Sequence, residues 1–198
     1  MKILITGFGP FLDNAENISQ KMLQFLKEDP GLSHLDISTQ ELPVEFSRAF
    51  EVFQNCQQKC NPDLVFQLGL AAGRTRIGLE KVGLNWVETR LPDNAGVMPV
   101  TGEIFKNEPL ALRCQMPWTE YMLKNPCPEV ELSFSAGAYV CNDLFYRSLR
   151  EESRLNNIYL VGFIHLPPES PLLSAARIKE ILVNIISWIA LNAKSGVR

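Results

Sequence analysis

Short apolar runs alternate with amphipathic segments along most of this chain. The runs are bounded by turn-forming residues and predict β-strands at 2–6, 35–42, 64–68, 82–86, 130–135 and 158–164. Between them, apolar residues recur with the period of a helix that buries one face, at 18–28, 46–60, 139–149 and 178–191. This alternation predicts an α/β fold, a three-layer α/β/α sandwich around a mostly parallel twisted sheet.

Length and charge narrow the class of protein without identifying it. A chain of 198 residues suits a single domain over 1–198. A net charge of -3 gives no electrostatic reason to expect nucleic acid or an anionic membrane as a partner. The apolar run Lys2–Thr6 is too short for a signal peptide, and the tract Ile181–Leu191 is shorter than the ~20 residues of a membrane span. We therefore expect a soluble protein.

The cysteines indicate a reducing, cytoplasmic setting. Five of them, an odd number without a predicted secretion signal, favour free thiols over a disulfide framework. Cys56 and Cys60 lie close together on a predicted helix, and helix packing explains them better than a zinc site, because no second pair or nearby histidine accompanies them. His34 and His165 are the only histidines, so metal ligands are scarce. We expect neither a metal nor a cofactor.

Open α/β sheets bind ligands beyond the carboxyl ends of their strands. The segments at those positions are 7–11, 69–74, 135–142 and 165–168. The first contains Gly7 and Gly9, but the dinucleotide fingerprint G-x-G-x-x-G requires a third glycine where Leu12 stands. Its rings, Phe8 and Phe11, instead predict part of a small apolar pocket, although core packing would also explain them.

Cys141 is the candidate nucleophile. It follows the small residues 135–138, where the fifth predicted strand gives way to a helix. A thiol in the first turn of a helix lies at the positive end of the helix dipole, which predicts a lowered thiol pKa and a reactive thiolate. Position alone leaves a buried structural cysteine as the alternative.

His165 closes the last predicted strand and is the candidate base. Pro167 and Pro168 stop the strand just after it, so the imidazole is expected at the ligand edge, where it could take the thiol proton and return it to a leaving amine. His34 lies in a predicted turn instead. A cysteine–histidine pair works best with a third group that orients the imidazole. Position alone does not choose among the nearby acids, which are Glu80, Glu88, Asp93 and Glu103.

These residues lie in motifs that resemble the pyroglutamyl peptidase I family, cysteine peptidases with a Cys–His–Glu triad. The resemblance runs from end to end and is carried by Thr6–Phe11, Leu42–Val44, Gly69–Arg74, Glu80–Val82, Arg90–Asn94, Thr101–Ile104, Ser135–Asn142 and Gly162–His165. The order Glu80, Cys141, His165 also resembles that of the family. Departures fall outside these three residues, as at Leu70 in the glycine turn and Ala138 before the nucleophile.

The resemblance implies a role for each matching position. It implies that Cys141 is the nucleophile, His165 the base and then the acid, and Glu80 the residue that orients His165. Arg90 would lie beside the developing oxyanion. The lactam ring would bind at Phe8, Phe11, Asn17, Val44, Leu70, Leu91, Tyr139, Val140 and Leu144. A mostly apolar slot suits a flat, neutral lactam, whereas the α-ammonium group of an ordinary N-terminus would be costly to desolvate there.

The implied activity is hydrolysis of the amide bond after an N-terminal pyroglutamyl residue, through a thioester acyl-enzyme. The substrates would be N-terminally pyroglutamylated peptides, the fold phosphorylase/hydrolase-like, and the assembly a homo-oligomer, often a tetramer in the family. Two alternatives stay open. One is a cysteine amidase for another small N-acyl or lactam substrate, given the altered glycine turn. The other is an inactive α/β binding homologue that keeps the pocket.

Overall fold

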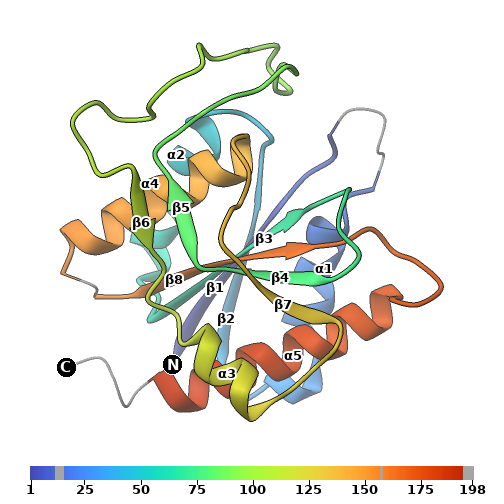
Figure 1. The fold of residues 1–198 in the computed structure, drawn as a ribbon. Helices are drawn as coiled ribbons and strands as arrows, with labels where there is room; N and C mark the ends of the chain where they lie inside the picture. Colours follow the sequence, from blue (N-terminus) through green and yellow to red (C-terminus); the bar gives the residue numbers. More distant parts are fainter. Residues whose placement is uncertain (12–15, 157, 194–198) are drawn as a thin grey trace.

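Six strands form one sheet at the centre of the computed structural model, which describes residues 1–11, 16–156 and 158–193 (Figure 1). In spatial order they are β2 (Asp36–Leu42), β1 (Lys2–Phe8), β3 (Leu64–Leu70), β8 (Leu160–Leu166), β4 (Ile77–Glu80) and β7 (Val130–Ser133). The first four run parallel, β4 runs antiparallel to β8, and β7 runs parallel to β4. The prediction of a mostly parallel sheet is confirmed. Leu12, where the dinucleotide fingerprint would need glycine, lies outside the described residues.

Helices cover both faces of this sheet. On one side α1 (Ile18–Lys27) and the short α3 (Trp118–Lys124) contact α5 (Ala175–Asn192), with a 3-10 turn at Pro30–Leu32. On the other side α2 (Arg48–Cys60) contacts α4 (Val140–Arg154). Figure 1 shows the two groups above and below the sheet, which is the predicted three-layer arrangement.

Polar caps and apolar stripes explain where the two longer helices of the first face, α1 and α5, lie. Asn17 begins α1 by accepting a hydrogen bond from the backbone N–H of Ser19 at 3.0 Å, and Ser174 begins α5 by accepting one from Arg177 at 3.3 Å. The stripe that α5 buries consists of Ile178, Ile181, Leu182, Ile185, Ile186 and Ile189. In the described part of the chain, no helix combines the length and the apolar character needed to cross a membrane.

Four short elements depart from the sequence prediction: two strands outside the main sheet, one strand within it and one helix. The run predicted at 82–86 lies outside the main sheet, because β5 (Val82–Leu84) pairs antiparallel with β6 (Ala111–Arg113) in a separate two-stranded sheet. Strand β4 was not predicted, since four residues that include Gly78 are too few to display a period. Helix α3 was missed for the same reason, with seven residues after Pro117. The segment 90–102 forms a loop, closed at its base by an isolated bridge between Val87 and Gly102.

Candidate active site

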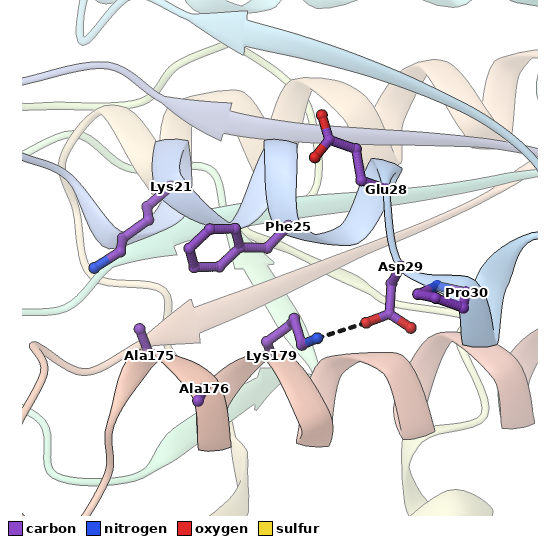
Figure 2. Close-up of a pocket in the computed structure, with 8 residues that line it drawn as sticks. All are labelled: Lys21, Phe25, Glu28, Asp29, Pro30, Ala175, Ala176 and Lys179. Atoms are coloured by element: carbon purple, nitrogen blue, oxygen red, sulfur yellow. Dashed lines mark ion pairs between the residues drawn. The ribbon is translucent and has the colours of Figure 1, made fainter.

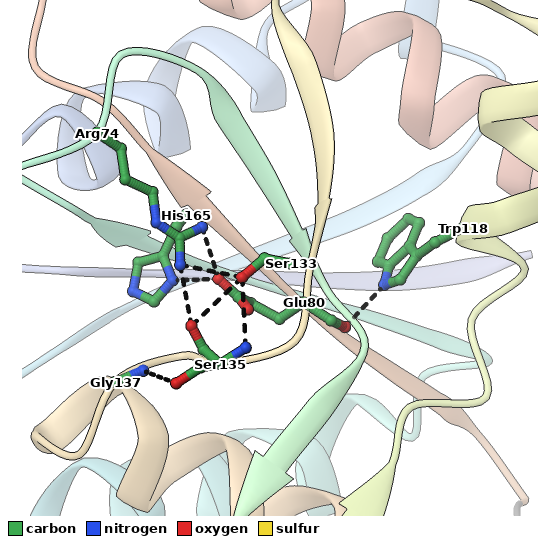
Figure 3. Close-up of polar contacts among 7 residues, drawn as sticks. All are labelled: Arg74, Glu80, Trp118, Ser133, Ser135, Gly137 and His165. Atoms are coloured by element: carbon green, nitrogen blue, oxygen red, sulfur yellow. Dashed lines mark hydrogen bonds and ion pairs between the residues drawn. The ribbon is translucent and has the colours of Figure 1, made fainter.

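A buried carboxylate and a buried imidazole meet where β4 and β8 run side by side. Glu80 ends β4, and His165 is the second-last residue of β8. The Nδ1 atom of His165 lies 2.7 Å from Oε1 of Glu80, and the Glu80 residue is 0% exposed (Figure 3). A carboxylate at that distance accepts a hydrogen bond from an N–H group at Nδ1, which leaves Nε2 as the basic nitrogen. The strand predicted at 82–86 would place Glu80 before a strand, whereas Glu80 is the last residue of one, β4.

Cys141 lies in the first turn of α4, close to His165. Gly69 on β3 is the direct neighbour of His165 across the β3–β8 ladder. A Cβ atom added to Gly69 would lie 3.0 Å from the sulfur of Cys141 and 2.8 Å from the ring of Phe163. Phe163 and His165 leave β8 on the same face, with ring centroids 4.8 Å apart. The sulfur and the imidazole therefore gather over the same stretch of sheet, in space that the missing side chain of Gly69 leaves open.

Burial dominates the acidity of the Cys141 thiol. It raises the pKa of Cys141 to about 12, and the negative charge of Glu80 acts in the same direction. A backbone hydrogen bond and the positive charge of Arg74 oppose them. The prediction of a lowered thiol pKa was therefore wrong, because desolvation outweighs the position at the helix start. A thiol that is protonated near neutral pH needs a base before it can attack, and His165 is the nearby candidate.

Arg74 completes a polar cluster that sequence reasoning missed. Its Nη1 atom lies 2.9 Å from Oε1 of Glu80, and its Nη2 atom donates hydrogen bonds to Ser133 Oγ at 3.1 Å and to the Ser135 carbonyl at 2.9 Å (Figure 3). The sequence offered one weak signal, which was an arginine shortly before a glutamate. Such a pair becomes informative only if the glutamate is buried, because a buried carboxylate requires a counter-charge. The sequence could not show that Glu80 would be buried.

Aromatic rings from three segments form an apolar cluster beside this polar one. The ring of Tyr139 lies 5.4 Å from that of Phe11 and 5.1 Å from that of Phe46, centroid to centroid. Its hydroxyl donates to the carbonyl of Pro92 at 2.9 Å. Tyr139 immediately precedes α4, so this cluster adjoins the start of the helix that carries Cys141. Phe46 had not been proposed as a pocket residue, because its periodicity assigned it to a helix.

The other candidates for the pocket lie in different settings. Phe8, Val44, Val140 and Leu144 are buried in the core. Asn17 is also buried and donates a hydrogen bond to the carbonyl of Gly9 at 2.9 Å, in addition to capping α1. Leu70 is partly buried at the end of β3, and Leu91 is 50% exposed. Arg90 is exposed, and its side chain makes no hydrogen bond or ion pair with the residues that the structure describes.

None of the other four cysteines has a comparable environment. All five are free, and burial raises the pKa of Cys114 to about 12 and that of Cys56 to about 11. Cys60 donates from its sulfur to the carbonyl of Cys56 at 2.9 Å, which is a contact within one helix. In the described ranges, no group of three His, Cys, Asp or Glu residues is arranged to hold a metal ion. The pair on α2 therefore has no third ligand among these residues.

A separate groove lies between α1 and α5, two helices that carry none of the residues Cys141, His165 and Glu80 (Figure 2). It has a volume of about 490 Å³ and is lined by Lys21, Phe25, Glu28, Asp29, Pro30, Ala175, Ala176 and Lys179. Nζ of Lys179 lies 2.7 Å from Oδ2 of Asp29 across it. None of the candidate catalytic or pocket residues lines this groove.

Comparison with known proteins gives one consistent result. The family model described as pyroglutamyl peptidase matches residues 1–179. The chain is 34% identical over 187 residues to the pyrrolidone-carboxylate peptidase of Bacillus amyloliquefaciens, covering 88% of this chain and 83% of the relative. It is 32% identical over 170 residues to the pyrrolidone-carboxylate peptidase of Pyrococcus furiosus, covering 84% and 81%.

Solved structures agree with these sequence relatives. The crystal structure of pyroglutamyl peptidase I from Bacillus amyloliquefaciens superposes with a TM-score of 0.83 at 32% identity, covering 93% of this chain and 94% of that one. A mutant pyrrolidone carboxyl peptidase from Pyrococcus furiosus gives 0.88 at 28% identity, covering 98% and 99%. The likeness therefore extends over nearly the whole of each chain.

Proposed function

Because this chain belongs to the pyroglutamyl peptidase family, and is therefore a cysteine-type hydrolase that removes N-terminal pyroglutamate, we propose that Cys141, His165 and Glu80 perform the hydrolysis. One observation carries the proposal. The carboxylate of Glu80 lies 2.7 Å from Nδ1 of His165, and the residue beside His165 on the next strand, Gly69, lies against the sulfur of Cys141. The proposal treats 1–198 as a single catalytic domain.

The proposed reaction begins with a proton transfer from Cys141 to Nε2 of His165. The thiolate then attacks the carbonyl carbon of the amide that joins the pyroglutamyl residue to the peptide, and not that of the lactam ring. The imidazolium returns the proton to the nitrogen of the leaving peptide. A thioester between Cys141 and pyroglutamate remains. His165 next takes a proton from water as the water oxygen attacks the thioester carbon. The C–S bond breaks, the imidazolium returns the proton to the sulfur, and pyroglutamate leaves. The carboxylate of Glu80 holds Nδ1 of the ring and stabilises the imidazolium in both halves of the reaction.

We place the developing oxyanion near the backbone N–H of Cys141. The first N–H groups of a helix have no acceptor within the helix, so those at the start of α4 can point at a negative charge. Arg90 is proposed as a second donor, since it is exposed and unpaired in the described part of the chain. Removal of one such donor typically costs ~2.7–4 kcal/mol of transition-state stabilisation.

The aromatic cluster is proposed as the site for the lactam ring. Phe11, Phe46 and Tyr139 would form its apolar walls, and exposed Leu91 lies on the loop whose Pro92 carbonyl is bonded to Tyr139. Moving a neutral five-membered lactam from water into such a site costs much less free energy than moving a charged α-ammonium group there. This difference supports selectivity for pyroglutamyl over ordinary N-terminal residues.

The test is release of a coumarin from a pyroglutamyl-coumarin amide under reducing conditions. We expect Cys141→Ala and His165→Ala to lose activity to background, and Glu80→Gln to retain the fold with kcat reduced by about 100-fold or more. Cys56→Ala removes a thiol of α2 that belongs to neither the proposed triad nor the proposed pocket, and as the matched control it should keep wild-type kinetics. Substantial activity in Cys141→Ala or His165→Ala would end the triad proposal.

Prolyl and free-amino aminoacyl amides, assayed in parallel, test the substrate. Hydrolysis of one of these in preference to the pyroglutamyl amide would show that the site does not select a neutral lactam and would contradict the proposed substrate. We further propose a cytoplasmic location, because all five cysteines are free thiols and the mechanism needs one of them reduced. Assembly into a homo-oligomer, implied by resemblance, is checked by light scattering of the purified protein.

A further inference from the structure

The carboxylate of Glu80 is shared between two cationic or proton-donating partners. Oε1 lies 2.7 Å from His165 Nδ1 and 2.9 Å from Arg74 Nη1. The contact with Nη1 is an ion pair without the alignment of a hydrogen bond, and Oε2 of Glu80 has no hydrogen-bond partner in the described residues. Arg74 therefore acts on this carboxylate mainly through its charge.

The guanidinium is held in this position by its surroundings. Nη2 donates to Ser133 Oγ at the end of β7 and to the Ser135 carbonyl just beyond it. The third constraint is Gly78, because a Cβ atom built on it would overlap Nη1 of Arg74. Gly78 is also the direct neighbour of His165 across the β4–β8 ladder. Arg74 thus fills the space that a side chain beside His165 would otherwise occupy.

Arg74 also joins the carboxylate to the segment that leads to the nucleophile. Ser135 accepts a hydrogen bond on Oγ from the N–H of Gly137 at 3.2 Å, and Gly137 turns the chain with a φ of 81° shortly before α4 (Figure 3). A φ in this region favours glycine, so the turn is locally determined. A single side chain therefore contacts both the group that orients His165 and the loop that precedes Cys141.

We propose that Arg74 is a positioning residue of the hydrolase, which keeps the carboxylate of Glu80 turned toward His165 and sets the pH range in which the Cys141–His165 pair is active. The proposal rests on the proposed triad. Arg74 reaches neither sulfur nor imidazole by a hydrogen bond, so its effect passes through Glu80 and through its electrostatic field.

The direction in which loss of Arg74 should move the pH profile follows from the charges around its guanidinium. The titratable groups that face it in the described chain are Glu80 on β4, Cys141 on α4 and His165 on β8, while the carboxylate of β7, Glu131, is paired with Arg76 at 3.1 Å. The positive charge of Arg74 favours the thiolate form of Cys141. Removing it should therefore raise the pKa of Cys141 further and move the acidic limb of the kcat/KM profile to higher pH.

The experiment measures kcat/KM against pH, with the pyroglutamyl-coumarin amide, for Arg74→Met, Arg74→Lys and Arg76→Met. Arg74→Met should lose about 10- to 100-fold in kcat/KM at pH 7. Its acidic limb should move up by about one pH unit. Arg74→Lys keeps the charge, so the limb should stay in place and part of the activity should return. Arg76→Met removes the same charge two residues away, from a surface ion pair, and should change neither quantity by more than about twofold.

Two further variants keep the proposal open to refutation. Gly78→Ala should displace the guanidinium from Glu80 and move the limb in the same direction as Arg74→Met, which decides the matter if that variant does not fold. An unmoved limb in every folded variant that loses the Arg74–Glu80 contact would overturn the proposal, as would an equal shift in Arg76→Met. Activity remaining in Cys141→Ala would instead refute the triad, independently of Arg74.

Discussion

The smallest scale, that of single residues, shows the difference between a position and its environment. The sequence placed Cys141 at a helix start, and that position was correct. The acidity inferred from it was not, because a sequence cannot report how much of a sulfur atom is withdrawn from water. Burial raises the pKa of Cys141 to about 12, so the reactivity of the thiol must depend on a neighbouring base.

This dependence predicts the alkylation behaviour of Cys141. At pH 7 the wild-type thiol should react with iodoacetamide only as fast as His165 accepts its proton, so His165→Ala should slow modification by roughly 10-fold or more. The rate in the variant should rise steadily toward alkaline pH, because a raised pKa delays formation of the thiolate. Mass spectrometry of the peptide that contains Cys141 measures the rate. Equal rates in wild type and variant near neutrality would contradict the prediction.

At the scale of elements, predictability follows the length of the pattern. The apolar stripes of long helices such as α1 and α5 repeat often enough to be identified. Strands β1, β3 and β8 are buried along nearly their whole length, so their sequences appear as mostly apolar runs. Strand β4 offers four residues and one glycine, so neither its existence nor the burial of Glu80 could be inferred. The choice of Glu80 therefore depended on family resemblance, and the role of Arg74, which depends on that burial, was missed.

Helix α4 carries Cys141 at its start and a buried carboxylic acid, Glu152, near its end, and this acid gives an element-scale prediction. Burial raises the pKa of Glu152 from 4.5 to about 8, and Oε1 has no hydrogen-bond partner in the described residues. Between these two pH values the unfolded chain has lost a proton that the folded chain retains, so stability should fall as pH rises through this window. The loss amounts to at most about 5 kcal/mol.

Glu152→Gln removes this ionisation and preserves an oxygen that can accept from the backbone. Its melting temperature should match that of the wild type near pH 4.5 and exceed it increasingly up to pH 8, beyond which the gap should stay constant. Glu151→Gln, with the same change of charge one residue earlier, is the control and should show little change across the series. A gap that is constant with pH would argue against burial of the Glu152 charge.

At the scale of the whole molecule, the site depends on pairings between distant segments. Strand β8 lies between β3 and β4, which brings Gly69 and Gly78 to either side of His165. The sequence predicted that strand ends would meet at one edge, because parallel sheets impose that arrangement. It could not predict the insertion of an antiparallel β4 next to β8, since local patterns contain no information about which strands are neighbours.

One contact joins this global packing to the chemistry. Trp118 on α3 is fully buried, and its indole N–H donates to the carbonyl of Glu80 at 3.2 Å (Figure 3). Its ring occupies the space over Gly162, where an added Cβ atom would overlap ring carbons of Trp118 and lie 2.7 Å from Met116. The absence of a side chain in the middle of β8 therefore lets α3 reach the strand that ends in Glu80.

Gly162→Ala should consequently disturb stability and activity together. Overpacking of this kind typically costs about 1–3 kcal/mol, and displacement of Trp118 should also free the backbone of Glu80 to move away from His165. We expect a lowered melting temperature and a reduced kcat with an almost unchanged KM, because the lactam site is formed by other segments. Gly73→Ala, at a position with open space around the added carbon, is the matched control and should leave both quantities unaltered. If Gly162→Ala lowered stability but left kcat intact, the geometry of Glu80 would be set by β4 and Arg74 alone, without support from α3.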